Sequence, residues 1–274
     1  MKVCMITAEN VSFFQHFLDR EFASDVISYG LMAEGVACGC AQVTLDQGQG
    51  KLCHMFVAPT FRRLGGGTLL LQTIGRELKR HGVERITASA AYLTYGEMAY
   101  VGHFLKGCHW VEQPVTSWRY TFPLAQACAQ YAKAPVKDKG LIPFGKIIPA
   151  QQRSLLKTMS NPEAKRELQE ILNLPDLCPH ASVLALGQRQ LDGYLMVRRW
   201  DDKMELVGLR HMGRDSTALY GMIGACFAWA EPVATPDTMV DMLITNEKVK
   251  SLAQHMLKDV AYSATPVHHF VHIL

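Results

Sequence analysis

The residues whose types and spacing most clearly suggest a chemical role form the segment RRLGGGT at positions 62 to 68. Three consecutive glycines remove every Cβ from the path of a ligand and permit backbone angles that other residues avoid. The run that follows, TLLLQTIGRELKRHG, has the apolar period of a helix, so the glycines stand at a helix N-terminus. The first N–H groups of a helix lack partners within it and carry the positive end of its dipole. We therefore predict an anion site here, suited to a phosphate or pyrophosphate.

Two common phosphate motifs do not fit this segment. A P-loop needs a lysine before the hydroxyl residue, whereas Gly67 is followed directly by Thr68. A dinucleotide fingerprint that began at Gly65 would need a third glycine where Leu70 stands. The sequence therefore favours neither nucleoside triphosphate hydrolysis nor dinucleotide binding.

The surrounding sequence predicts alternating strands and helices, which the glycine segment joins. In the first half we expect strands near 3–7, 26–46 (a hairpin turning at Glu34-Gly35), 51–57, 85–91 and 115–122, and helices near 10–23, after the glycines as far as Gly82, and at 96–106. In the second half we expect helices within 150–173, from 216 and over 247–258, and strands at 181–187, 191–199, 203–209, 238–244 and within 260–273. A Pro-, Gly- and Lys-rich stretch from 132 to 146 predicts a linker between the halves.

Short matches between the halves indicate an internal duplication. HFLKGC at 103–108 recurs as HMLKDV at 255–260, 152 residues further on, and Lys51-Leu52 recurs as Lys203-Met204 at the same offset. The strings are short, so a chance likeness between two strand and helix patterns is the alternative. Arg62-x-x-Gly65 also has a counterpart, in Arg210-x-x-Gly213.

The longer string VAPTFRRLGGGT, from Val57 to Thr68, resembles the acetyl-CoA loop of the GNAT-type N-acetyltransferase superfamily, [Q/R]-x-x-G-x-[G/A] between the fourth strand and the third helix. The resemblance covers about 25–122 well and 180–273 more weakly. It implies an α/β (α+β) fold of two GNAT-like domains, each a mixed, mostly antiparallel twisted sheet flanked by helices. The expected domains are 1–135, which binds acetyl-CoA, and 143–274, a degenerate copy.

The resemblance also implies where the cofactor lies. The pantetheine arm is expected along the main chain of Met55, Phe56 and Val57. The pyrophosphate is expected on the loop formed by Arg62, Arg63, Leu64, Gly65, Gly66, Gly67 and Thr68. A carboxylate introduced at Gly66 is expected to abolish binding with little effect on the fold. In the second copy Asp215 stands where the phosphate would sit, so that half is predicted not to bind acetyl-CoA conventionally.

Three residues are candidates for the proton transfers. The acceptor amine must lose a proton before it attacks the thioester, and His54 is a candidate base, with a half-buried structural imidazole as the alternative. In the family a helix tyrosine protonates the departing thiolate, and His103 occupies that position here. Tyr100, one turn earlier, is the alternative acid, and a purely local hydrogen bond is the alternative role for His103.

These expectations define an acetyl-CoA-dependent N-acetyltransferase that acts on a small-molecule amine by direct attack. A non-catalytic acyl-CoA sensor or interaction protein is the alternative, because the family's tyrosine is missing. Net charge is +3 without a Lys/Arg run, so no nucleic-acid partner is expected. No apolar span or leader is apparent, which predicts a cytoplasmic protein without membrane contact, as a monomer or homodimer. Eight scattered cysteines predict reduced thiols and no metal site.

Overall fold

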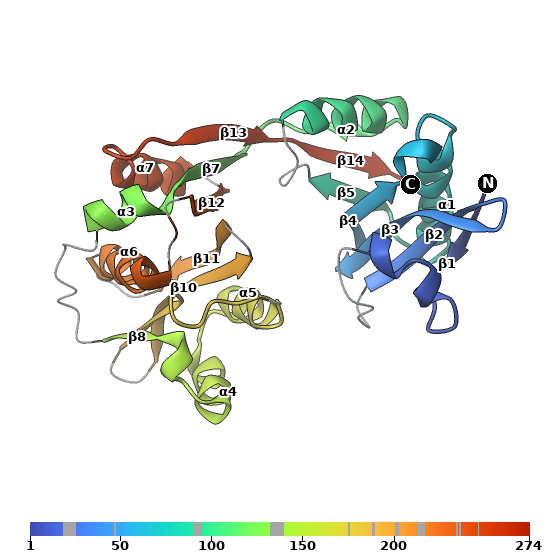
Figure 1. Ribbon diagram of the computed structural model, residues 1–274. Coiled ribbons are helices and arrows are strands. Elements are labelled where there is room, and N and C mark those ends of the chain that lie inside the picture. The colour runs from blue at the N-terminus through green and yellow to red at the C-terminus, as the bar shows by residue number, and fades with distance from the viewer. Residues whose placement is uncertain are drawn as a thin grey trace. The chain divides into compact units, whose positions relative to one another are not determined.

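The computed structural model describes residues 1–18, 26–46, 48–89, 95–131, 140–174, 176–187, 190–200, 203–212, 217–233, 235, 237–245 and 247–274. The chain divides into two compact units, one formed by 1–115 with 267–274 and the other by 116–266. Each unit contains a seven-stranded sheet with helices packed on it (Figure 1). The predicted fold class of two α+β domains with mixed sheets is confirmed.

The sheet of the first unit has the strand order β1-β2-β3-β4-β5-β14-β6. Its strands are β1 (Lys2–Met5), β2 (Val26–Ala33), β3 (Val36–Asp46), β4 (Gln49–Val57), β5 (Arg85–Ser89), β6 (Val111–Glu112) and β14 (His269–Ile273). Strands β4 and β5 are parallel, and the other neighbouring pairs are antiparallel. The predicted hairpin turn is confirmed, because Glu34 and Gly35 have φ angles of 50° and 84°, the left-handed values that a tight two-residue turn requires.

Two layers cover the first sheet on opposite faces. The helices and 3₁₀ turns are η1 (Val11–Phe13), η2 (Gln15–Phe17), η3 (Pro59–Phe61), α1 (Gly66–Arg80) and α2 (Tyr95–Gly107). Leu70, Ile74 and Leu78 recur at helical spacing and bury the inner stripe of α1 in the main core. The short turns η1 and η2 lie on the other face, where Phe14 packs against Cys40 (Figure 1). They replace the described part of the helix expected over 10–23, of which residues 19–23 lie outside the described chain.

The sheet of the second unit has the order β13-β7-β12-β11-β10-β9-β8. Its strands are β7 (Ser117–Pro123), β8 (Leu141–Pro143), β9 (Val183–Leu186), β10 (Leu191–Trp200), β11 (Lys203–His211), β12 (Met239–Ile244) and β13 (Ser263–Val267). Its helices are α3 (Leu124–Tyr131), η4 (Phe144–Lys146), α4 (Pro149–Thr158), α5 (Pro162–Leu172), α6 (Thr217–Ala230), η5 (Glu231–Val233) and α7 (Glu247–Met256).

The two sheets repeat the same pattern, as the duplication hypothesis requires. Read from β8, the second order matches the first strand for strand, with β11 and β12 as its parallel pair. The pairing of Lys51 with Thr87 recurs as the pairing of Lys203 with Met239, both 152 residues further on. The offset found in the sequence is therefore also the offset of the sheet register.

The boundary between the units differs from the expected one, because the two halves exchange a strand. β7 from the first half pairs with β12, and β14 from the chain's end pairs with β5. Phe122 and Phe270, each 1% exposed, fix these strands in the second and first cores respectively. The units therefore separate at Val115/Thr116 and residues 267–274 return to the first unit, whereas domains of 1–135 and 143–274 were expected.

The eight cysteines are free thiols. Burial raises the pKa of the Cys128 thiol to about 11, which keeps it protonated and unreactive. In the part of the chain that the structure describes, no helix has both the length and the apolar character to cross a bilayer.

Candidate active site

Strands β4 and β5 separate partway along their length, which leaves one edge of β4 open. Their parallel pairing covers Gly50 to Leu52 and ends where Leu52 meets Ala88, yet β4 continues to Val57. A β-bulge lies at the same level. Val43 of β3 pairs with Leu52 and Gln42 pairs with His54, so Cys53 is an extra residue in β4. Within the described residues, the β5 side of 53–57 has no strand partner, so its main chain is open to an extended ligand.

The open edge leads directly into the glycine loop. Arg63 and Gly65 both have left-handed backbones, with φ of 62° and 83°. The first hydrogen bond of α1 runs from the Leu69 amide to the Gly65 carbonyl oxygen at 3.0 Å, so the amides of Gly66, Gly67 and Thr68 come before it. No acidic side chain occupies the first turn and no side chain caps it. The positive end of α1 is therefore available to an anion.

Both arginines of the loop are exposed and held in place by neighbours. Arg62 Nε donates to the Val57 carbonyl oxygen at 2.9 Å, and its guanidinium lies 5.8 Å from the centre of the Phe56 ring. Arg63 donates through a terminal guanidinium nitrogen to the Tyr100 hydroxyl oxygen at 3.0 Å. Since a guanidinium has five N–H donors, each keeps donors for a phosphate.

The three glycines are required for three different reasons. A Cβ on Gly65 would have open space, but its φ of 83° disfavours other residues. A Cβ on Gly67 would lie 3.0 Å from Cζ of Phe104. A Cβ on Gly66 would lie 2.6 Å from Cδ2 of Leu31, which is fully buried in the first core. This corrects the expectation for Gly66, because its missing side chain would point into the core and not at the anion.

We therefore expect Gly66→Ala to lower the free energy of unfolding by about 1–3 kcal/mol, as overpacking of a core does. Urea unfolding of the full chain, followed by tryptophan fluorescence, measures this. Gly107→Ala is the matched control, because a Cβ there meets nothing within 4 Å. Equal stability of the two variants would contradict the tight packing of Gly66 against Leu31.

His54 lies on the face of β4 that is turned away from α1. Met55 and Val57 join the core under α1, so strand alternation places His54 and Phe56 on the opposite face. His54 Nε2 is 2.8 Å from the Phe17 carbonyl oxygen, and the Phe17 and Phe56 rings stack at 5.5 Å. A carbonyl oxygen only accepts, so Nε2 donates this hydrogen bond.

The two candidate acids on α2 lie in different surroundings. Val101, Phe104 and other apolar residues of α2 face the core. With about 3.6 residues per turn, exposed His103 projects from the opposite side of the helix. Tyr100 is 68% exposed and contacts Arg63 of the loop. The structure thus brings Tyr100, and not His103, next to a predicted cofactor residue.

The strand exchange brings a histidine into this unit that the sequence pattern does not indicate. The strand expected within 260–273 would place His268 and His269 in the second half, whereas His269 is the first residue of β14 and pairs with Ser89 of β5. His268 Nδ1 contacts Glu112 Oε1, and Lys106 Nζ lies 2.5 Å from Glu112 Oε2. Hydrogen bonds from Lys106 and His268 hold the pKa of the Glu112 carboxyl below its ordinary value. No local signal could have found this, because the partner strands are far apart in sequence.

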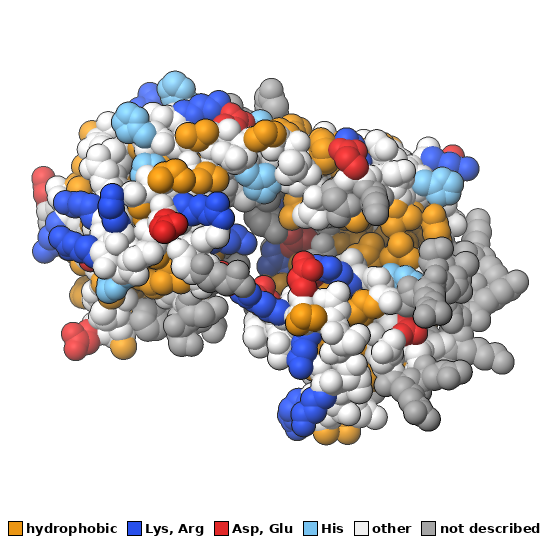
Figure 2. Space-filling view, turned by 180° about the vertical axis from the view of Figure 1, so that it is seen from behind, with side chains coloured by type: hydrophobic (Ala, Val, Ile, Leu, Met, Phe, Trp, Pro, Cys, Tyr) orange, Lys and Arg blue, Asp and Glu red, His pale blue; other side chains and the backbone are white. Residues whose placement is uncertain are grey.

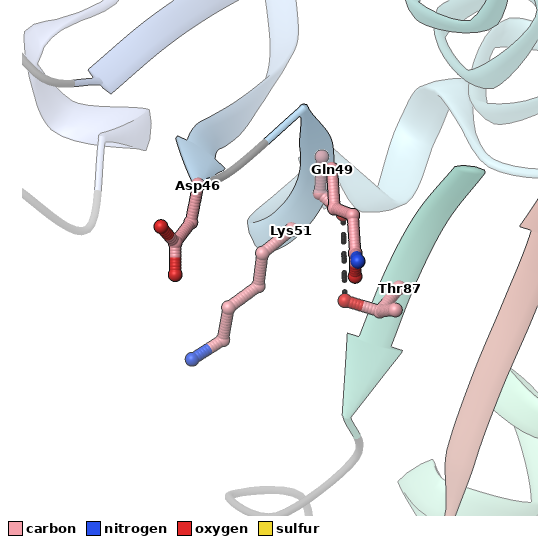
Figure 3. A pocket seen from close by; sticks show the side chains of 5 residues that line it. Asp46, Gln49, Lys51 and Thr87 are labelled. Atoms are coloured by element: carbon pink, nitrogen blue, oxygen red, sulfur yellow. Dashed lines mark hydrogen bonds between the residues drawn. The ribbon is translucent and has the colours of Figure 1, made fainter. Parts of the chain in front are cut away.

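A small pocket lies at the other end of β4, away from the glycine loop. It is lined by Asp46, Gln49, Gly50, Lys51 and Thr87. In Figure 3, Thr87 points back to β4, where its hydroxyl donates to the Gly50 carbonyl oxygen at 3.4 Å, while Lys51 extends outward. The pocket holds about 170 Å³, which is small for a ligand site.

Charged side chains are distributed over the surface. On the face that Figure 2 shows, Lys and Arg side chains are spread over the surface with acidic side chains among them. A small anion needs only a local basic spot, which Arg62 and Arg63 provide at the loop. No group of three His, Cys, Asp or Glu side chains that could hold a metal ion occurs among the described residues.

Solved structures with a similar fold include a tandem protein. The chain is similar to a tandem GNAT protein from the clavulanic acid biosynthesis pathway, with a TM-score of 0.65, 13% identity, and coverage of 90% of this chain and 82% of that one. It is also similar to a probable N-acyltransferase from Enterococcus faecalis V583, with a TM-score of 0.62, 13% identity, and coverage of 99% and 72%. A third similar structure is a GCN5-related N-acetyltransferase from Sphaerobacter thermophilus, with a TM-score of 0.57, 15% identity, and coverage of 97% of this chain and 85% of that one. The class of protein is thus that of the tandem GNAT fold.

The sequence of the first unit gives a family match. Residues 3–95 match the model of the acetyltransferase (GNAT) family, which is less than half of the chain. The two units share one order of strands in their sheets. No curated protein matches the sequence.

Proposed function

We propose that the protein is an acetyl-CoA-dependent N-acetyltransferase whose acceptor is a small-molecule amine. The observation that carries the proposal is the continuity of the open β4 edge with the uncapped N-terminus of α1. The edge suits an extended amide-containing arm, and the helix start suits a diphosphate. Coenzyme A joins these two groups in one molecule.

The geometry of the loop supports the following roles for its residues. Main-chain groups of Met55, Phe56 and Val57 pair with the pantetheine arm. The amides of Gly66, Gly67 and Thr68 donate to the pyrophosphate, as do free N–H groups of Arg62 and Arg63. Gly65 allows the turn, and Leu64, which is 60% exposed, borders the site. Each hydrogen bond to a charged group contributes about 1.5–3 kcal/mol.

The transfer itself needs two proton movements. The acceptor nitrogen must be neutral to form a bond to the thioester carbon, and a main-chain N–H of the open edge stabilises the oxyanion that develops. The C–S bond then breaks and the thiolate takes up a proton. We assign that proton to Tyr100, because it lies at the loop whereas His103 projects from the outer side of α2.

In the second unit, the arginine that corresponds to Arg62 already has carboxylate partners. Arg210, the counterpart of Arg62, lies within β11 and is ion-paired with Glu163 at 3.1 Å and Glu167 at 2.6 Å, both on α5. Two carboxylates therefore take the charge that a phosphate would need. Gly213 and Asp215 of the expected loop lie outside the described residues.

We predict one acetyl-CoA site per chain. Isothermal titration calorimetry of the full chain should give a stoichiometry of one. The Arg62→Ala variant should weaken that binding, whereas Arg210→Ala, the matched change in the second copy, should not. Two equivalent sites per chain, or loss of binding in Arg210→Ala alone, would contradict the assignment.

The proposed activity is tested by thiol release from acetyl-CoA with a panel of small primary amines and amino acids. Amine-dependent release, with the acetylated amine found by mass spectrometry, is the expected result. Tight cofactor binding without turnover on any amine would favour the acyl-CoA sensor instead. A peptide with a free N-terminus belongs in the panel, because turnover on it alone would overturn the small-molecule assignment.

A further inference from the structure

His269 lies on the same sheet face as His54, although the two residues come from opposite ends of the chain. Phe270 is buried under α2, so its neighbour His269 points to the other face of the sheet. In β5, Ile86 and Ala88 face the core, which places Ser89 on that same outer face. Ser89 is the strand partner of His269.

His269 and its strand partner Ser89 form one row across the sheet, and this row lies at the point where β4 and β5 separate. The last β4–β5 pair joins Leu52 to Ala88, and the next residue of β5 is Ser89, opposite His269. Since paired neighbouring strands lie about 4.8 Å apart, β14 runs about 10 Å from β4 at the last paired level, where Leu52, Ala88 and Phe270 lie side by side. A thioester held against β4 and an amine beside it fit within that span.

In the second unit, the two side chains of the corresponding row contact each other. The residue that corresponds to Ser89 is Asp241, 152 positions further on, and its partner in β7 is Thr121. The Thr121 hydroxyl donates to Asp241 Oδ1 at 2.5 Å. The same row in the first unit therefore presents His269 and Ser89 together on the outer face.

The surroundings of His269 keep its ring neutral. The pKa of His269 is lowered from the ordinary value of 6.5, mainly by burial and further by the neighbouring charges of His268 and Lys51. Lys51 of β4 acts on His269 from the same outer face, on which His54 also lies. The β5 residues of that face are Thr87 and Ser89, which do not titrate. His268 is bonded to Glu112, which also holds Lys106. A half-buried neutral imidazole at this place is ready to accept a proton.

We infer that His269 is a catalytic residue of the first unit and accepts the proton of the acceptor amine. This rests on the proposed acetyl transfer. The acceptor ammonium gives one proton to the imidazole, and the neutral nitrogen then bonds to the thioester carbon. The C–S bonding pair leaves with sulfur, which takes the Tyr100 proton, while the nitrogen loses its second proton through water to the Tyr100 phenolate. The His269 imidazolium afterwards returns its proton to water. The active site of the N-terminal domain is therefore completed by the C-terminal strand.

The test compares His269→Gln with His272→Gln and His54→Gln. His272 is a control on the same strand, since it points to the other face and its Nδ1 is 3.3 Å from the His109 carbonyl oxygen. We expect kcat of His269→Gln to fall about 100-fold or more, the usual share of a general base, with an unchanged acetyl-CoA Kd. The acid limb of kcat/KM, which lies below pH 6.5 in the wild type, should disappear in this variant and persist in both others.

A readout without turnover accompanies the kinetics. Histidine ring signals in a ¹H–¹³C NMR titration should assign a pKa below the ordinary value to His269, identified by its loss in His269→Gln. His269→Asn repeats the test if the glutamine variant does not fold. A His269→Gln enzyme within threefold of wild type, or an acid limb lost in His54→Gln instead, would overturn the inference. An inactive wild type would refute the proposed function itself, which is a separate outcome.

Discussion

Phe270→Ala, a change in strand β14, is expected to destabilise the first unit by about 3–5 kcal/mol. Phe270 is 1% exposed and packs in the core that α1 and β5 form, so its loss leaves a cavity there. The free energy of unfolding of a domain is about 5–15 kcal/mol, so this loss would unfold part of the protein at 37 °C and weaken or abolish acetyl-CoA binding. Hydrogen exchange read by mass spectrometry should show the loss of protection in peptides from 26–89.

Ile273→Ala is the control for this prediction, because Ile273 lies on the same strand but is 70% exposed. It should leave stability and protection near wild type. Increased exchange confined to peptides from 140–260 in Phe270→Ala would contradict the exchange of strands. That outcome would return β14 to the second unit, as the sequence alone suggested.

Gly65→Asp is expected to weaken acetyl-CoA binding about 100-fold, the equivalent of about 3 kcal/mol or two charged hydrogen bonds. A Cβ at Gly65 has open space, so the side chain reaches solvent beside the amides of Gly66 to Thr68. Its carboxylate would repel the pyrophosphate and compete for those amides. Calorimetric titration with acetyl-CoA measures the effect.

Two controls separate charge from backbone strain. Gly65→Asn imposes the same left-handed strain without charge and should retain most of the affinity. Gly82 has a φ of 78° and open space at the far end of α1, so Gly82→Asp carries the charge away from the site. If Gly65→Asp binds acetyl-CoA as Gly82→Asp does, the anion does not sit at the helix N-terminus.

Much of the fold could be predicted from the sequence because local signals were strong. Alternating apolar residues and the Glu34-Gly35 turn gave the hairpin of β2 and β3, and Leu70, Ile74 and Leu78 gave α1. The offset of 152 gave the internal repeat, which the register of β4 with β5 and of β11 with β12 confirms.

The exchange of β7 and β14 could not be predicted in the same way. A strand's partner is decided by burial against distant residues, as Phe122 and Phe270 show, and the local pattern of a strand does not name its sheet. The Pro-rich stretch after 132 carried the stronger local boundary signal. The single expected strand over 260–273 is in fact two strands, β13 and β14, in different sheets.

The sequence indicated the residues of the glycine loop but not the residues that other strands bring near it, for a related reason. The loop residues 62–68 are contiguous, so one motif indicated them together. His269 approaches the same region only through pairing with β5, and the core contact of Gly66 with Leu31 depends on packing between α1 and β2. Roles that depend on tertiary neighbours were therefore missed or misjudged.

The most direct test is a crystal structure of the full chain with coenzyme A. The diphosphate oxygens should lie within about 3.2 Å of the amide nitrogens of Gly66, Gly67 and Thr68, with the pantetheine arm along 53–57. A diphosphate bound elsewhere on the chain, or a coenzyme arm that does not follow β4, would contradict the account.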